Sequence, residues 1–262
     1  MDWYAFPFFL EVTVGGLLSG VMYAMAAIGF VLICKTSGVL NFAQGAMVLF
    51  AALTFVSPVK HGFPLSLAIA ATLIVMTVLG FVIERTALRP LANRSPMVLF
   101  MAASGLSYVI EGLAQPIWGT QVHRLALGIS NTSFEIGGIF IPTFDLVAAA
   151  MFAVLTIFFR FTRTGPGFRA VADDQFAGLA VGLRLDRTWA TVWTAAGFVA
   201  LAAGLLWGAR LGAQFSLSLI VLKALPVLVL GGFGSILAGL PVGTPKKLAE
   251  PYLGGAQEIH PS

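Results

Sequence analysis

Long apolar runs separated by short polar connections dominate the pattern of this chain. Six runs are long enough, or nearly so, to cross about 30 Å of hydrocarbon as helices, which takes roughly 17 to 25 apolar residues. A seventh apolar region, residues 219–240, is broken by Pro226 and by glycines near Gly231, so it predicts one interrupted span or two half-helices. The predicted fold class is all-α, a polytopic transmembrane helix bundle. The six clear spans are expected at residues 12–34, 39–59, 65–83, 97–118, 144–161 and 189–209.

The composition also places this bundle in a bilayer. The chain has 262 residues, of which 58% are hydrophobic and 10% charged, whereas soluble domains carry about 25% charged residues. The net charge of +4 is spread between the apolar runs and forms no continuous basic patch. We therefore expect membrane lipid around the chain and no nucleic-acid partner.

The basic residues predict the orientation, because cytoplasmic connections carry an excess of Lys and Arg. If the connection after the third run is cytoplasmic, nine basic residues fall on that side and three on the other. This predicts a multi-pass protein of the inner (plasma) membrane with its N-terminus outside. No basic residue precedes the first run, so no cleavable signal peptide is expected. The nine are Lys35, Arg85, Arg89, Arg94, Arg160, Arg163, Arg169, Arg184 and Arg187, and the three are Lys60, Arg124 and Arg210.

The sequence contains no catalytic constellation. His61, His123 and His260 lie outside the predicted spans, and the single Cys34 excludes both an intrachain disulfide and a multi-cysteine metal cluster. The phosphate-loop pattern GxxxxGK[ST] does not occur. We therefore expect no enzyme activity, cofactor or metal site in this chain.

Polar residues within the spans are candidates for a translocation path, since they are costly in lipid. Asn41 and Gln44 share a face at the cytoplasmic start of the second span, with Gly45 beside them. A helix cap with interhelical hydrogen bonds explains Asn41 and Gln44 equally well. Glu111 lies on a stripe with other polar residues of the fourth span and contacts solute, another helix or the outer interface. Lys223 either snorkels to the interface or pairs with a carboxylate, for which Glu111 is one conceivable partner.

Residues 160–188 form a polar connection that is long for a turn between spans, and the charge count places it in the cytoplasm. Its TGPG stretch ends the fifth helix. Apolar residues then recur at helical spacing, while Asp173 and Asp174 fall on the other face, which predicts a short amphipathic helix. A helix lying on lipid headgroups would favour Lys and Arg on its polar face. The acidic face therefore favours a protein partner, which Phe176 would also contact.

Three stretches of the chain resemble a known family. They are NFAQGAM, GFRAVADDQFAGLAVGLRLDRTWATVWTAAGFVALAAGLLWGARLG and LKALPVLVLGGFGSILAG. Together they resemble the membrane permease of Liv-type ABC importers for branched-chain amino acids, and the likeness extends over about residues 14–252. The resemblance implies that residues 1–262 form a single transmembrane permease domain.

The resemblance further implies a larger assembly. It implies a pore formed with a second, related permease subunit, two cytoplasmic ABC ATPase subunits that hydrolyse ATP, and an external solute-binding protein that delivers the small-molecule solute. Residues 160–188 would carry a coupling helix that docks in a groove of the ATPase. The positions of this sequence that match the family's coupling segment are Gly167, Arg169, Ala170, Asp173, Asp174, Ala177 and Gly182.

Two points leave alternatives open. Typical members of the family continue through a further span, whereas residues 243–262 contain no apolar run long enough to cross, so a tail lacking the last span is expected. The same superfamily also moves urea and short amides, and Asn41 and Gln44 suit an amide as well as an amino acid. A channel or secondary transporter would call for an internal repeat or an intramembrane ion relay, and the sequence indicates neither.

Overall fold

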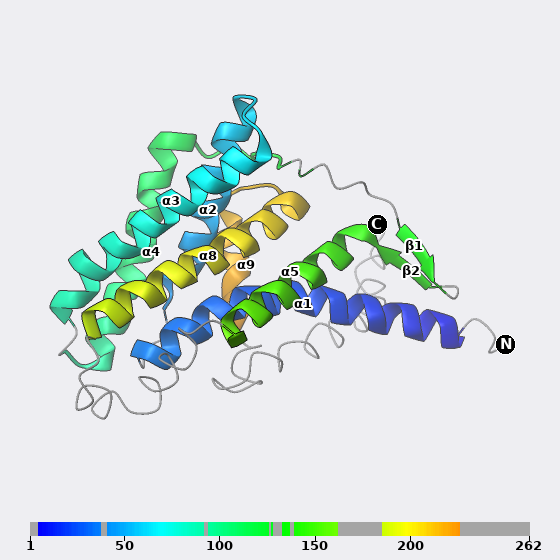
Figure 1. Cartoon of the computed structure of the whole chain (residues 1–262), viewed down its shortest axis with the longest axis horizontal. Coiled ribbons are helices and arrows are strands. Elements are labelled where there is room, and N and C mark those ends of the chain that lie inside the picture. The colour runs from blue at the N-terminus through cyan, green and yellow to red at the C-terminus, as the bar shows by residue number, and fades with distance from the viewer. Residues whose placement is uncertain are drawn as a thin grey trace, which may run out of the picture.

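The computed structural model describes residues 5–37, 41–91, 94–125, 127, 133–136, 139–161 and 185–225 of the chain. Every predicted clear span corresponds to a helix, and the first helix begins earlier than the hydrophobic pattern predicted (Figure 1). Residues 160–161 and 185–188, assigned from sequence to the long connection, are helical instead. The long helices are α1 (Ala5–Ser37), α2 (Ala43–Lys60), α3 (Leu65–Ile83), α4 (Pro96–Trp118), α5 (Thr143–Phe161) and α8 (Leu185–Leu211).

Among the described residues, five helices are long and apolar enough to cross a membrane: α1, α2, α3, α4 and α8. The apolar part of α5, Thr143–Phe158, is shorter. The seventh region begins as the short helix α9 (Ser216–Leu222), and the rest of that region from Pro226 onward lies outside the described residues, as does the predicted tail 243–262. The chain is therefore a polytopic helix bundle, and five of the helices in its described part meet the length of a full span.

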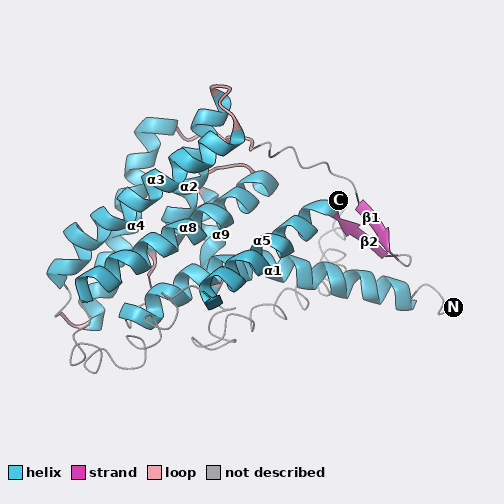
Figure 2. Cartoon of the chain, in the orientation of Figure 1, coloured by secondary structure: helices cyan, strands magenta, loops and turns pink. Residues whose placement is uncertain are grey.

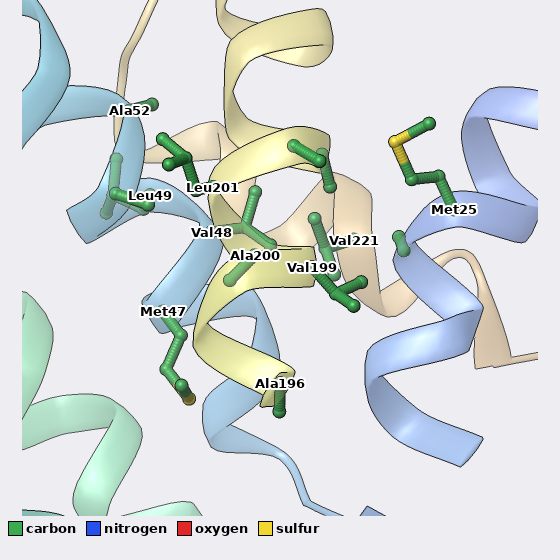
Figure 3. Packing of buried hydrophobic residues seen from close by; sticks show 14 of the residues in the cluster. Met25, Met47, Val48, Leu49, Ala52, Ala196, Val199, Ala200, Leu201 and Val221 are labelled. Carbon is green, nitrogen blue, oxygen red and sulfur yellow. The ribbon is translucent and has the colours of Figure 1, made fainter. Parts of the chain in front are cut away.

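Helix α8 lies at the centre of the bundle, in contact with α1, α2 and α3. Figure 3 shows α8 between α1 and α2, with Val199 and Ala200 pointing into the apolar core. The alanines and valines of α8 are small enough to bring the neighbouring helices close, and 78% of its spanning window is buried. A central helix of this kind transmits displacement to each helix packed on it.

Glycines lie at several close contacts between helices. Gly204 of α8 faces the Val48 carbonyl of α2, where an added Cβ would lie 2.7 Å from the oxygen. Gly197 of α8 likewise faces the Met76 carbonyl of α3, at 3.2 Å from an added Cβ. Such small residues let backbones approach where lipid supplies no hydrophobic drive. Gly208, four residues further along α8, also lies against α2, with an added Cβ 3.6 Å from the Ala52 side chain.

Helices α3 and α4 form the outer layer beside α2, and they expose much of their surface. Only 28% and 22% of their spanning windows are buried, against 67% for α1 and for α2. The exposed side chains on both helices are mainly large and apolar, such as Ile74, Val78, Met101 and Ile117. Exposed faces of this kind suit lipid or another membrane subunit.

Helix α3 ends in irregular turns at the side of the bundle where α2 begins. A π-helical turn, η1 (Glu84–Leu88), is followed by a 3-10 turn, η2 (Arg89–Leu91). Glu84 is buried at the start of the π-helical turn, which contacts both α4 and α8. The apolar periodicity of the third run gave no sign of this change in helix type.

The connection after α4 contains a β-hairpin, formed by β1 (Ser133–Ile136) and β2 (Ile139–Pro142) in antiparallel register (Figure 2). The sequence predicted a wholly helical chain apart from loops, so the hairpin is an addition to the all-α bundle. Strand β2 contacts both α1 and the start of α5. The pairing of β1 with β2 gives backbone N–H and C=O groups of both strands hydrogen-bond partners.

Candidate functional site

The polar side chains at the start of α2 lie in the interior of the protein. Asn41 is 1% exposed and Gln44 is fully buried. The Asn41 side-chain Oδ1 accepts a hydrogen bond from the Ala43 backbone N–H at 3.0 Å, and the Asn41 backbone carbonyl accepts one from the Gln44 N–H at 3.2 Å. Asn41 thus satisfies free N–H groups at the beginning of the helix, as the capping alternative predicted.

Gln44 lies where three helices meet. Its Nε2 donates a hydrogen bond to the Ala196 carbonyl of α8 at 3.4 Å. On α1, the Gln44 amide occupies the space that a Cβ at Gly29 would need. Ala196 is labelled on the α8 ribbon in Figure 3. A glycine on α1 and a backbone carbonyl on α8 therefore fix the position of one side chain from α2.

Each of these two amides retains one polar atom without a hydrogen-bond partner in the described part of the chain. The atoms are Asn41 Nδ2 and Gln44 Oε1. The amide orientations follow from the chemistry, because Oδ1 of Asn41 faces an N–H donor and Nε2 of Gln44 faces a carbonyl acceptor. Unpaired buried polar atoms are uncommon in proteins, since leaving one unsatisfied costs about 1–3 kcal/mol.

Gly45 has a packing role in the structure. The backbone of α9 crosses α2 at this position, and a Cβ on Gly45 would overlap the Ser218 carbonyl oxygen. Ser218 itself donates its hydroxyl hydrogen to the Phe215 carbonyl at 2.9 Å. The prediction that Gly45 lines a translocation path stays a prediction, and the contact seen here is between two helix backbones.

Glu111 and Lys223 are not brought together with the amides of α2. Glu111 is half-buried on α4, and α4 packs on α2 through ring contacts such as Phe42 with Phe100, at 4.9 Å between ring centroids. Phe42 and Gln44 are two residues apart, which places them on nearly opposite sides of a helix. Lys223 follows α9 and is exposed. No ion pair joins Glu111 to Lys223 among the described residues, so their pairing stays a prediction.

A second group of contacts ties the opposite end of the bundle together. Lys60, at the end of α2, places its Nζ 2.6 Å from Nδ1 of His123, and His123 Nε2 lies 2.9 Å from the Trp118 carbonyl. Nε2 donates to the carbonyl, so Nδ1 is the acceptor from Lys60. The His123 backbone also exchanges two hydrogen bonds with Ala213, beyond α8. The ends of α2, α4 and α8 therefore lie on one side.

An ion pair lies at this same end. Arg210 Nη1, in the last turn of α8, is 3.4 Å from Asp145 Oδ1, in the first turn of α5. Each charge complements the dipole of its own helix, a carboxylate at an N-terminus and a guanidinium at a C-terminus. The sequence pattern did not identify this pair, because its two members are far apart along the chain.

The predicted coupling residues lie outside the described residues. They are Gly167, Arg169, Ala170, Asp173, Asp174, Phe176, Ala177 and Gly182. Within the described ranges, no group of three or more His, Cys, Asp or Glu side chains is arranged to hold a metal ion.

The class of protein is thus a multi-pass helical membrane protein, with a tightly packed centre and buried amides where its helices cross. Residues 12–260 match the family described as the permease component of branched-chain amino acid transport systems, and the chain belongs to that family. The family predicted from the three sequence stretches is confirmed. No solved structure matches the chain significantly.

Relatives that match along most of the chain are named as permeases. The chain is 28% identical to the high-affinity branched-chain amino acid transport system permease protein LivH of Salmonella typhimurium, over 95% of this chain and 88% of that protein. It is 27% identical to LivH of Escherichia coli K12 with the same coverage of both chains. The permease protein BraD of Pseudomonas aeruginosa is 29% identical, over 90% of this chain and 84% of that protein.

Proposed function

We propose that the chain is the membrane-spanning permease subunit of an ABC importer that moves branched-chain or similar amino acids across the inner membrane. The observation that carries the proposal is the family match over residues 12–260. It is supported by relatives named for branched-chain amino acid transport that cover 95% of this chain. The subunit works without a cofactor or covalent chemistry, and ATP is hydrolysed on separate partner subunits.

The working assembly contains this chain, a second related permease, two ABC ATPase subunits and an external solute-binding protein. The exposed apolar faces of α3 and α4 support this arrangement, because a bundle that stood alone would leave them all to lipid.

The N-terminus lies outside, and residues 160–188 lie in the cytoplasm. The shared end formed by Lys60, His123 and Ala213 supports the alternation of connections on which the charge count rests. This end belongs to the side with few basic residues. The opposite side includes Arg85 and Arg89, which follow α3 and add to the cytoplasmic excess of positive charge.

Residues 160–188 carry a coupling helix that docks on the ATPase. Through this contact, the conformational change driven by ATP hydrolysis is passed to the helix bundle. Two boundaries support this role. Helix α5 ends at Phe161, and the next described helix, α8, begins at Leu185. The connection therefore leads directly into the central helix, and a displacement of α8 acts on α1, α2 and α3 at once. The bundle then alternates between inward-open and outward-open states.

The proposed translocation path includes Asn41 and Gln44, with Gly45, Glu111 and Lys223 as further candidates. The two amides have the stronger support, because each keeps a buried polar atom available for hydrogen bonding. The positions of Gly45, Glu111 and Lys223 add no further argument for a path.

The experiment that tests the proposal is co-purification from the native membrane. An affinity-tagged copy of this chain is expected to bring down an ABC ATPase subunit, identified by mass spectrometry and by ATP hydrolysis. Replacing both acidic residues, Asp173→Ala with Asp174→Ala, is expected to reduce the recovered ATPase. The control Lys60→Ala, at the opposite end of the bundle, is expected to leave recovery unchanged. Purification without any ATPase would favour a channel or secondary transporter.

A further inference from the structure

We propose that Asn41 and Gln44 form a neutral, two-point hydrogen-bonding site for the solute, and that Gly29 is the residue that positions the Gln44 amide. The inference rests on the proposed transport function and adds the chemical class that the path recognises. That class is a solute that offers both a hydrogen-bond donor and a hydrogen-bond acceptor and carries no net charge.

The unpaired atoms of the two amides differ in their hydrogen-bonding chemistry. Asn41 Nδ2 can only donate, and Gln44 Oε1 can only accept. The other polar atom of each amide is already engaged, with the Ala43 N–H and the Ala196 carbonyl respectively. A complementary solute must therefore offer an acceptor to Asn41 and a donor to Gln44.

The surroundings of the two amides bear on the charge of the solute. In the described part of the chain, the hydrogen-bond partners of the two amide side chains are a backbone N–H and a backbone C=O, and a glycine lies against Gln44; none of these groups carries a charge. Dipoles of this kind bind a group that is neutral overall, because a lone buried ion would require a compensating charge. The main-chain groups of an α-amino acid meet this condition, since the carboxylate accepts and the ammonium donates. A primary amide or urea carries the same pair of functions.

Gly29 leaves the space that the Gln44 amide occupies, although the sequence pattern did not single out this glycine. A methyl group at this position would overlap both Nε2 and the side-chain carbonyl carbon of Gln44. The Gln44 amide can therefore reach the Ala196 carbonyl only because α1 carries no side chain here. Gly29→Ala is expected to push the amide away from α8 and to move Oε1 from its present position.

The chain supplies a matched control. Gly105 and Gly112 of α4 are also helical glycines, but nothing lies within 4 Å of a Cβ added at either position. Gly105→Ala thus makes the same chemical change without displacing a neighbour. A difference between Gly29→Ala and Gly105→Ala reports on the Gln44 contact and not on a general effect of replacing helical glycine.

The test uses the complete importer in proteoliposomes, with its binding protein and ATPase subunits. It measures ATP-driven uptake of radiolabelled leucine and, separately, of acetamide, together with the ATP consumed per solute. Asn41→Ala, Gln44→Ala and Gly29→Ala are each expected to raise the ATP consumed per solute at least tenfold. Gly105→Ala is expected to leave this ratio unchanged. The double variant Gly29→Ala with Gln44→Ala should be no worse than Gln44→Ala alone.

Two results of this assay would overturn the inference. A loss of uptake and of ATP hydrolysis in equal proportion, with lower thermal stability and an unchanged ratio, would show a purely structural role and overturn the inference. An unchanged ratio in fully stable variants would overturn it as well. Uptake of leucine but not acetamide identifies the main-chain groups of an amino acid as the ligand, and the reverse result identifies an amide. If the unmodified importer moves neither solute, the proposed function fails, and the inference fails with it.

Discussion

Arg210 and Asp145 join the last turn of α8 to the first turn of α5, with 3.4 Å between Nη1 and Oδ1. The two partners differ in environment, since the Arg210 side chain is 41% exposed and that of Asp145 only 4%. Arg210 also approaches the Met22 sulfur of α1 at 3.2 Å. One guanidinium thus connects three helices at the end of the bundle that we propose to be external.

This asymmetry predicts unequal effects of removing either partner. Arg210→Ala leaves a buried carboxylate without its cation and should lower the free energy of unfolding by roughly 1–3 kcal/mol. Asp145→Asn should cost less, because Arg210 is already partly solvated. The measurement is the thermal unfolding midpoint of the purified protein in detergent. The exposed Arg124 at the same end provides the control Arg124→Ala, and an equal effect of all three variants would contradict the account.

The helix crossings predict a second contrast, between glycines at backbone contacts and glycines in open space. Gly45→Ala and Gly204→Ala place a methyl group against the Ser218 and Val48 carbonyls, and each should cost roughly 1–3 kcal/mol of stability. Gly112→Ala meets no neighbour, so the better helix propensity of alanine should stabilise the protein by about 0.5–1 kcal/mol. Thermal unfolding of the three variants gives the comparison, and stabilisation by Gly204→Ala would contradict the crossing geometry.

The sequence predicted the helices well, because a bilayer requires long apolar helices whose lengths can be read from hydrophobic runs alone. It could not predict which faces meet. Whether Gln44 points to α1, α4 or α8 depends on the packing of all these helices, and the opposing Gly29 has no local signal. The hairpin was missed because its strands, four residues each, are too short for a clear alternating pattern.

The Asn41 and Gln44 pattern was compatible with a path and with a helix cap. The hydrogen bonds to Ala43 and Ala196 use Oδ1 of Asn41 and Nε2 of Gln44, as expected for a helix cap with an interhelical hydrogen bond. The proposed path uses the other polar atom of each amide, Nδ2 of Asn41 and Oε1 of Gln44, which have no partner in the described part of the chain. Sequence spacing could place the two residues on one face, but only the positions of neighbouring helices decide which atoms find partners.

The orientation predicts the sides from which introduced cysteines can be labelled. In a Cys34→Ala background, Lys60→Cys is expected to react with a membrane-impermeant maleimide in intact cells. Arg94→Cys should react only after the membrane is opened, because the charge count places it in the cytoplasm. Both positions are exposed, so burial does not protect either thiol. Labelling of Arg94→Cys alone in intact cells would reverse the proposed orientation.

If the amphipathic helix predicted from the sequence around Asp173 and Asp174 couples to the ATPase, altering it should cause a distinct defect. Replacement of Asp173 and Asp174 by Ala, or Phe176→Ala, should reduce uptake and abolish the stimulation of ATP hydrolysis by loaded binding protein. Membrane insertion should be unchanged, because the segment lies outside the spans. The assay is ATP hydrolysis in proteoliposomes with and without loaded binding protein. Variants in the path, such as Asn41→Ala, serve as the comparison, since they should retain this stimulation.

The most direct test of the central claim is solute uptake by the purified assembly. The chain is reconstituted with its second permease, ATPase subunits and binding protein, and radiolabelled leucine is supplied outside the vesicles. The account predicts leucine accumulation against its gradient that requires ATP inside and the binding protein outside. Accumulation that proceeds without ATP, or equilibration down the gradient alone, would contradict the assignment of this chain to an ATP-driven importer.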